Sequence, residues 1–164
     1  MAAAPVPAYI GAMSDTLYNT QILRLAASVP HGVRLADAQA SVVKVSPVCG
    51  SRVTVDLDIG DDGRVARFGQ EVRACALGQA AAALLAANVV GRSAEELRAA
   101  HDQLTGYLSG AADVPGDWPG LGVFAPARPY KARHASILLA FAAASAAAAQ
   151  AVDSRVEMAD IRAR

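Results

Sequence analysis

The sequence predicts an α+β fold in which an antiparallel three-stranded sheet has helices packed on one face. The strand-like segments all lie between residues 40 and 73, one helical pattern precedes them, and the other helical patterns follow them. Residues Arg52–Ile59 alternate between apolar and polar side chains, and Gly60–Gly63 has the composition of a hairpin turn. Strands grouped apart from helices are typical of α+β proteins, whereas a doubly wound sheet alternates the two.

The size and charge of the chain indicate one compact domain. It has 164 residues, 54% of them hydrophobic, and a formal net charge of zero. We expect a flexible leader over residues 1–13, the domain over residues 14–152 and a tail over residues 153–164. The balanced charge and few aromatic residues argue against nucleic-acid binding. The N-terminus lacks the basic flank and continuous apolar segment of a secretion signal, which predicts a cytoplasmic protein.

The first half of the domain is expected to hold one helix and the sheet. The helix begins at a cap formed by Ser14 or Asp15 and ends before Pro30. The strands are Ala40–Val48, Arg52–Ile59 and Arg64–Arg73, the last being one strand or a pair. One face of the middle strand supplies core residues: Val53, Val55, Leu57 and Ile59. The nearby acidic residues are interpreted as solvent-facing rather than as a calcium site: Asp56, Asp58, Asp61 and Asp62.

The second half is expected to be helical. Cys75 opens an alanine-rich helix, and Ser93 with Glu96 forms a capping box that starts the next one. A loop rich in glycine and proline follows over residues 110–129, with a helical turn around residues 118–123 and Trp118 as its apolar anchor. The last helix runs from Tyr130 or Lys131 to Val152.

Two uncharged stretches, residues 74–90 and 136–152, raise the question of membrane spans. Both are dominated by alanine, and a span needs about 20 strongly apolar residues. We therefore expect two buried helices and no membrane interaction.

The two cysteines lie at junctions between predicted secondary-structure elements. Cys49 follows a strand and Cys75 begins a helix, where the helix dipole favours a thiolate, so Cys75 is expected to be the better ligand or nucleophile. In a reducing compartment they are free thiols, either metal ligands or inert buried side chains. With His134 in the first turns of the last helix they would suit zinc, ferrous iron or half of a cluster's ligand set. Ser51, another side chain, solvent or a partner would supply a fourth ligand. His31 and His101 are not expected to take part.

Four segments, in this order, resemble the U-type iron–sulfur cluster assembly scaffolds (IscU, SufU and the N-terminal domain of NifU). They are Leu17-Tyr18-Asn19-Thr20-Gln21-Ile22-Leu23, Pro47-Val48-Cys49-Gly50, Cys75-Ala76 and Pro129-Tyr130-Lys131-Ala132-Arg133-His134-Ala135-Ser136. The resemblance covers residues 15 to 150 approximately. It implies the α+β fold of that family and a site that assembles a cluster on three cysteines and an aspartate, often with zinc bound in the resting state.

Two of the family's four ligand positions differ here. Cys49 and Cys75 match the first two cysteines, and Ser51 stands at the aspartate. At the third cysteine, one alignment places Ala135 and the other places His134, which would give a Cys₂His set; histidine replaces cysteine at Rieske centres. The family's chaperone-binding loop matches residues 127–131 only at Pro129 and Lys131, so that interaction is not expected.

The leading functional hypothesis is therefore a scaffold or carrier, not an enzyme, that binds iron or a transient cluster at Cys49, Cys75 and His134, with Ser51 nearby. The resemblance implies a cysteine desulfurase as sulfur donor and apo-proteins as acceptors, for a monomer or a homodimer. The alternative is a degenerate member that binds zinc or no metal and acts as a regulatory or structural partner. Nucleophilic catalysis by Cys75 with His134 is disfavoured because no orienting carboxylate lies near either in sequence.

Overall fold

The computed structural model describes residues 17–164, so the expected leader and the cap at Ser14 or Asp15 lie outside the described residues. The described elements are α2 (Thr20–Ala27), β1 (Ala40–Val45), β2 (Arg52–Ile59), β3 (Val65–Arg73), α3 (Ala76–Asn88), α4 (Ala94–Ser109), the 3₁₀ helix η1 (Leu121–Ala127) and α5 (Lys131–Ala163). Asn19 caps α2 by accepting a hydrogen bond from the N–H of Ile22 at 3.0 Å.

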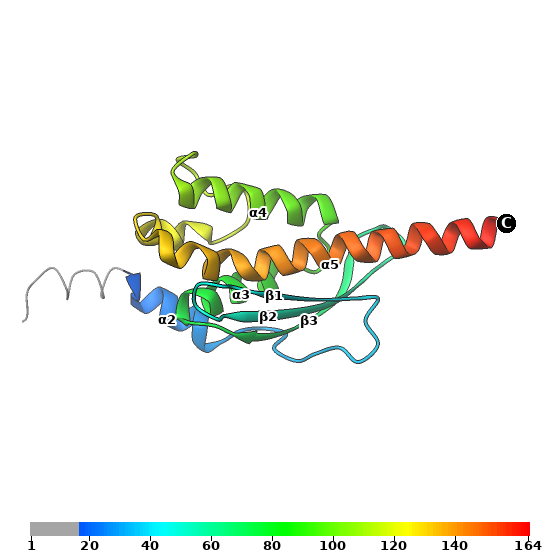
Figure 1. The fold of residues 1–164 in the computed structure, drawn as a ribbon, viewed down its shortest axis with the longest axis horizontal. Coiled ribbons are helices and arrows are strands. Elements are labelled where there is room, and N and C mark those ends of the chain that lie inside the picture. Colours follow the sequence, from blue (N-terminus) through cyan, green and yellow to red (C-terminus); the bar gives the residue numbers. More distant parts are fainter. Residues whose placement is uncertain (1–16) are drawn as a thin grey trace, which may run out of the picture.

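The three strands form one antiparallel sheet in the order β1-β2-β3, which confirms the predicted fold class. The register pairs Val42 with Val55 and Val55 with Gln70. The four predicted core residues of β2 are all buried. Helix α5 lies along β1 and β2, α3 packs beside it against β3, and α4 lies on the far side of α5 (Figure 1). The core therefore lies between the sheet and this helical layer.

Alanine lets α3 and α5 pack closely in that layer. Their buried positions are mostly alanine, for example Ala80–Ala83 in α3 and Ala143, Ala144, Ala147 and Ala148 in α5. By length and composition, α5 is the one helix among residues 17–164 that could cross a membrane, but 56% of its most apolar window is buried inside the protein. Helix α5 continues to Ala163, beyond its expected end at Val152, and Arg155 bonds the carbonyl oxygen of Ile59 at 3.1 Å.

The outer face of the sheet is partly covered by the segment of residues 28–39. Arg34 Nε lies 2.7 Å from Asp56 Oδ2, and the same carboxylate accepts hydrogen bonds from Ser41 Oγ at 2.6 Å and Leu35 N–H at 3.0 Å. Asp56 is 0% exposed. The expectation that Asp56 faces solvent is therefore wrong: alternation does point it away from the helices, but this covering segment shields it. Asp61 and Asp62 are exposed.

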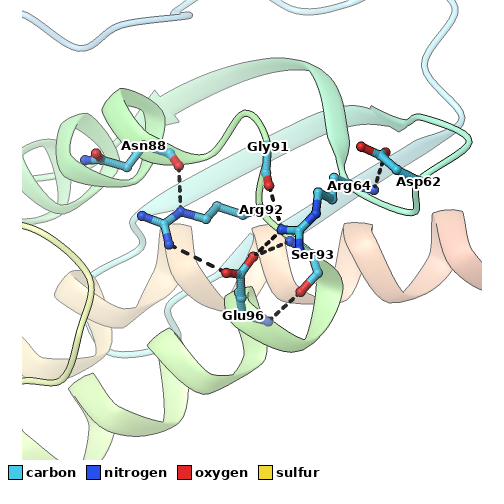
Figure 2. Close-up of polar contacts among 7 residues, drawn as sticks. All are labelled: Asp62, Arg64, Asn88, Gly91, Arg92, Ser93 and Glu96. Atoms are coloured by element: carbon cyan, nitrogen blue, oxygen red, sulfur yellow. Dashed lines mark hydrogen bonds and ion pairs between the residues drawn. The ribbon is translucent and has the colours of Figure 1, made fainter.

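The junction between α3 and α4 is organised by Glu96, as Figure 2 shows. Ser93 Oγ accepts from Glu96 N–H at 3.1 Å and the Glu96 carboxylate accepts from Ser93 N–H at 2.8 Å, which confirms the predicted capping box. Arg64 Nη1, at the end of the β2–β3 hairpin, bonds Glu96 Oε2 at 3.1 Å and the Gly91 carbonyl at 2.9 Å. The backbone N–H of Ser93 is the main reason that the pKa of Glu96 lies below its ordinary value.

Trp118 anchors the long loop between α4 and α5, as predicted. It is 4% exposed, its Nε1 donates to the carbonyl of Leu84 at 2.9 Å, and its ring meets Phe141 edge to face at 5.5 Å. The helical turn expected at residues 118–123 begins later, because η1 spans Leu121–Ala127.

Candidate functional site

The first thiol is carried by a tight loop between β1 and β2. Ser46 N–H donates to the Ser51 carbonyl at 2.8 Å, and Gly50 N–H donates to the Ser46 carbonyl at 2.9 Å. Gly50 has a φ of 71°, in the left-handed region that glycine adopts without a steric penalty. This turn leaves Cys49 exposed at the end of the sheet, with Ser46 and Ser51 buried beneath it.

The second thiol stands at the start of α3. Cys75 is the N-cap residue of this helix, with extended backbone angles, and its side chain makes no capping hydrogen bond. Its sulfur is therefore not committed to the helix end. It is half-buried and faces α5 instead, as the next contact shows.

A chain of two hydroxyls connects the thiols. Cys49 Sγ lies 3.0 Å from Ser51 Oγ, Ser51 Oγ lies 3.4 Å from Ser136 Oγ, and Ser136 Oγ lies 3.3 Å from Cys75 Sγ. These atoms come from the β1–β2 loop, α5 and the start of α3. The structure thus brings together three predicted site residues, Cys49, Ser51 and Cys75, and adds Ser136, to which the sequence analysis gave no role.

The hydroxyls act on Cys49. The Ser46 hydroxyl, followed by the hydroxyl and backbone N–H of Ser51, lowers the pKa of the Cys49 thiol to about 7. Ser46 Oγ is buried and has no hydrogen-bond partner among the described residues, so Ser51 Oγ, at 3.0 Å, is the hydroxyl of the two in hydrogen-bond contact with the sulfur. Sequence reasoning favoured Cys75 as the more reactive thiol. In the structure Cys49 is the exposed cysteine, and its surroundings favour the thiolate.

The imidazole of His134 is bonded to backbone carbonyls and not to the hydroxyl chain between the thiols. Its Nε2 lies 3.0 Å from the carbonyl oxygen of Ala127 and 3.1 Å from that of Arg128, so this nitrogen carries the proton and donates to the end of η1. In the part of the chain that the structure describes, no three His, Cys, Asp or Glu side chains gather into a group that could hold a metal ion. The expected convergence of Cys49, Cys75 and His134 is thus not seen there, and ligation by His134 stays a prediction.

The missed residue, Ser136, had a weak signal in the sequence. It lies in the last of the four resembling segments, but nothing in its spacing distinguishes it from other helical serines. Only the crossing of α3 and α5 brings its hydroxyl to the thiols.

Among known proteins, the chain is similar to several whose structures are solved. No family model and no curated protein matches it. It is similar to the crystal structure of a nitrogen-fixing NifU-like protein (N-terminal) from Brucella abortus, with 42% identity and a TM-score of 0.80, covering 86% of this chain and 98% of that one.

Two further structures share the fold at lower identity. One is a putative iron–sulfur cluster assembly scaffold protein for the SUF system from Fervidobacterium islandicum AW-1, at 17% identity and a TM-score of 0.75. The other is a hypothetical protein at 20% identity and a TM-score of 0.67. Each match covers 82% of this chain and 98% of the other. Given the 42% identity to the Brucella protein over almost its whole length, this chain belongs to the U-type iron–sulfur cluster assembly scaffold family, as a NifU-like N-terminal domain.

Proposed function

We propose that this protein is an iron–sulfur cluster assembly scaffold or carrier that receives iron and sulfur as cargo on Cys49 and Cys75. One observation carries the proposal. The only two thiols of the chain, 26 positions apart in sequence (75 − 49), are linked through Ser51 and Ser136 at one end of the sheet, and Cys49 there is exposed. Thiolates are the usual ligands of iron in clusters.

The site would hold its cargo by thiolate ligation and release it by ligand exchange, with no turnover of an organic substrate. The pKa of about 7 keeps a large fraction of Cys49 as thiolate at neutral pH, which is the form that binds iron or accepts sulfur. Two thiolates are fewer than the four protein ligands of a stable cluster, so the remaining positions are left for His134, hydroxyl oxygens, solvent or the acceptor. Such a site favours transfer over storage.

Family membership supports the rest of the proposal. A cytoplasmic cysteine desulfurase would supply the sulfur, and apo-proteins would take the product. If His134 serves as third ligand, either its free Nδ1 binds the iron or its Nε2 gives up the carbonyls of Ala127 and Arg128.

A second function is favoured by a different observation. No three His, Cys, Asp or Glu side chains gather among residues 17–164. This favours a degenerate scaffold that binds zinc or no metal and acts as a regulatory or structural partner of the assembly machinery.

Anaerobic reconstitution with iron, cysteine and a desulfurase separates the two functions. The scaffold hypothesis expects sulfide-to-iron charge-transfer absorption and bound iron, both lost in Cys49→Ser and in Cys75→Ser. A featureless spectrum and no bound iron in the wild-type chain would reject it. A zinc analysis of the protein as purified then distinguishes a zinc-binding protein from one without metal.

The role of His134 needs a matched pair of variants. His134→Gln is compared with His101→Gln, since His101 lies on α4 and its ring contacts Asp102 at 3.4 Å. If only His134→Gln loses bound iron, His134 is a ligand of the cargo site. If the two variants bind equal amounts of iron, His134 is not a ligand.

A further inference from the structure

Ser136 occupies the central position between the two thiols. It is 2% exposed, and its hydroxyl contacts both Cys75 Sγ at 3.3 Å and Ser51 Oγ at 3.4 Å. Two hydroxyl protons are available for three contacts when both thiols are ionised, because a thiolate only accepts. In that state the Ser51 hydroxyl donates to Cys49 and the Ser136 hydroxyl donates to Cys75. The contact between the two hydroxyl oxygens, the longest of the three, is then not a hydrogen bond. Within this chain of two hydroxyls, each thiolate thus has one hydroxyl donor.

Helix α3 makes room for this hydroxyl with a glycine. A Cβ atom at Gly78 would lie 2.7 Å from Ser136 Oγ and 2.7 Å from the Cβ of Ala74, closer than such atoms approach in proteins. The neighbouring buried positions Ala80–Ala83 are all alanine, so alanine is compatible with this helix layer elsewhere. At Gly78 the missing side chain allows α5 to place Ser136 against Cys75.

We propose that Ser136 is a positioning residue for the cargo-holding thiolates, and that Gly78 makes its position available; this inference rests on the proposed function. The hydroxyl of Ser136 donates to the Cys75 thiolate and holds it in place relative to Ser51 and Cys49. A hydrogen bond that fixes the orientation of a ligating sulfur strengthens retention of the metal, in the way that outer-shell partners support metal ligands.

The test measures how fast iron leaves the reconstituted protein when a chelator is added under anaerobic conditions. Ser136→Ala is compared with Ser145→Ala, a serine on the same helix outside the hydroxyl chain. We expect about tenfold faster iron release from Ser136→Ala and the wild-type rate from Ser145→Ala. Gly78→Ala, which keeps Ser136 but displaces its hydroxyl, should act in the same direction, whereas Gly106→Ala, a helical glycine with room for a methyl group, should not.

A second readout does not depend on iron. At a pH low enough to protonate both thiols, the two cysteines of the chain should give two S–H stretching bands in its infrared spectrum, and Cys49→Ser assigns them. Ser136→Ala should shift the Cys75 band by removing its hydrogen-bond partner, and Ser145→Ala should shift neither band. If Ser136→Ala releases iron at the wild-type rate and its Cys75 band is unshifted, the positioning role of Ser136 is overturned while the proposed function stands. A wild-type chain that holds no iron would overturn the proposed function and, with it, the positioning role.

Discussion

The acidity of the Cys49 thiol depends on its immediate neighbours. The hydroxyls of Ser46 and Ser51 and the Ser51 N–H lower the pKa of its thiol to about 7. At pH 7 about half of such a thiol is ionised, compared with about 3% of a thiol with a pKa of 8.5. The hydroxyls and the backbone N–H of this loop thus favour a thiolate at neutral pH.

We predict a pH dependence for alkylation of Cys49. In the Cys75→Ser background, where Cys49 is the one remaining thiol, the iodoacetamide rate should reach half its maximum near pH 7. Ser51→Ala removes a donor at 3.0 Å, so its curve should move to higher pH and its rate at pH 7 should fall several-fold. Ser109→Ala, which changes an exposed serine at the end of α4, is the control. Superimposable curves for Ser51→Ala and its parent would contradict this account.

Asp56 is a buried carboxylate whose partners make the stability depend on pH. Burial would raise its pKa, but hydrogen bonds from Arg34, Ser41 and Leu35 outweigh burial and hold the pKa below its ordinary value. In the unfolded chain the pKa is about 3.9. The stabilisation is therefore fully present above that pH, and it is lost as the pH falls through the lower pKa of the folded protein.

We predict that Asp56→Asn lowers the free energy of unfolding by about 1–3 kcal/mol at pH 7, since donors at 2.6–3.0 Å lose a charged acceptor. Urea denaturation at pH 7 and at pH 3 measures the free energy of unfolding of the variant and of the wild type. The difference between these two free energies should be smaller at pH 3. Asp102→Asn, an exposed residue of α4, should match wild type at both values, and a constant difference for Asp56→Asn would exclude the ionised carboxylate as its cause.

At the scale of elements, the helix layer depends on how closely α3 approaches α5. Gly78→Ala would add a methyl group 2.7 Å from atoms of Ala74 and Ser136, so we predict a loss of about 1–3 kcal/mol. Gly106→Ala in α4 meets nothing closer than 3.9 Å and should instead gain about 0.5–1 kcal/mol from helix propensity. Thermal denaturation compares the two variants, and a gain of stability in Gly78→Ala as well as in Gly106→Ala would show that helix propensity, not packing, governs position 78.

Helix α5 makes its last tight contact with the body at Arg155. This side chain bonds the Ile59 and Gly60 carbonyls and Asp61, whereas residues 156–164 are all exposed. Deletion of residues 160–164 should change the free energy of unfolding by less than about 0.5 kcal/mol. Arg155→Ala in the full chain should cost about 1–2 kcal/mol, and Arg162→Ala should cost nothing measurable. Urea titrations test all three, and a large effect of the deletion would assign a packing role to the exposed turns.

For the molecule as a whole, local patterns were enough to predict the architecture. The alternation in β2, the turn after Ile59 and the Ser93–Glu96 capping box each encode their element within a few residues. The misplaced features depend on contacts between distant segments. Asp56 is buried by Arg34, 22 positions away, and the role of Ser136 depends on contacts 61 and 85 positions away in sequence. The prediction of His134 as a ligand rests on its place in the last segment that resembles the scaffold family, and that segment could not reveal that η1 would place carbonyls against its Nε2.

The thiol site joins three parts of the fold, so cargo binding should stabilise the whole protein. A ligand held by Cys49 on the β1–β2 loop and Cys75 at the start of α3 binds the folded chain in preference to the unfolded one, in which the two thiols separate. At a free iron concentration 100 times the dissociation constant this linkage contributes about 2.7 kcal/mol. We predict that anaerobic ferrous iron raises the melting temperature of the wild-type chain and that a chelator reverses the rise.

The cysteine variants decide whether that stabilisation comes from the site. Each single change, Cys49→Ser or Cys75→Ser, should remove most of the rise, because one remaining thiolate cannot bridge two elements. The double variant should show none. An equal rise in the double variant would place the iron elsewhere on the protein, whereas a rise that persists only with Cys75 present would show that Cys49 takes part in delivery of the cargo and not in holding it.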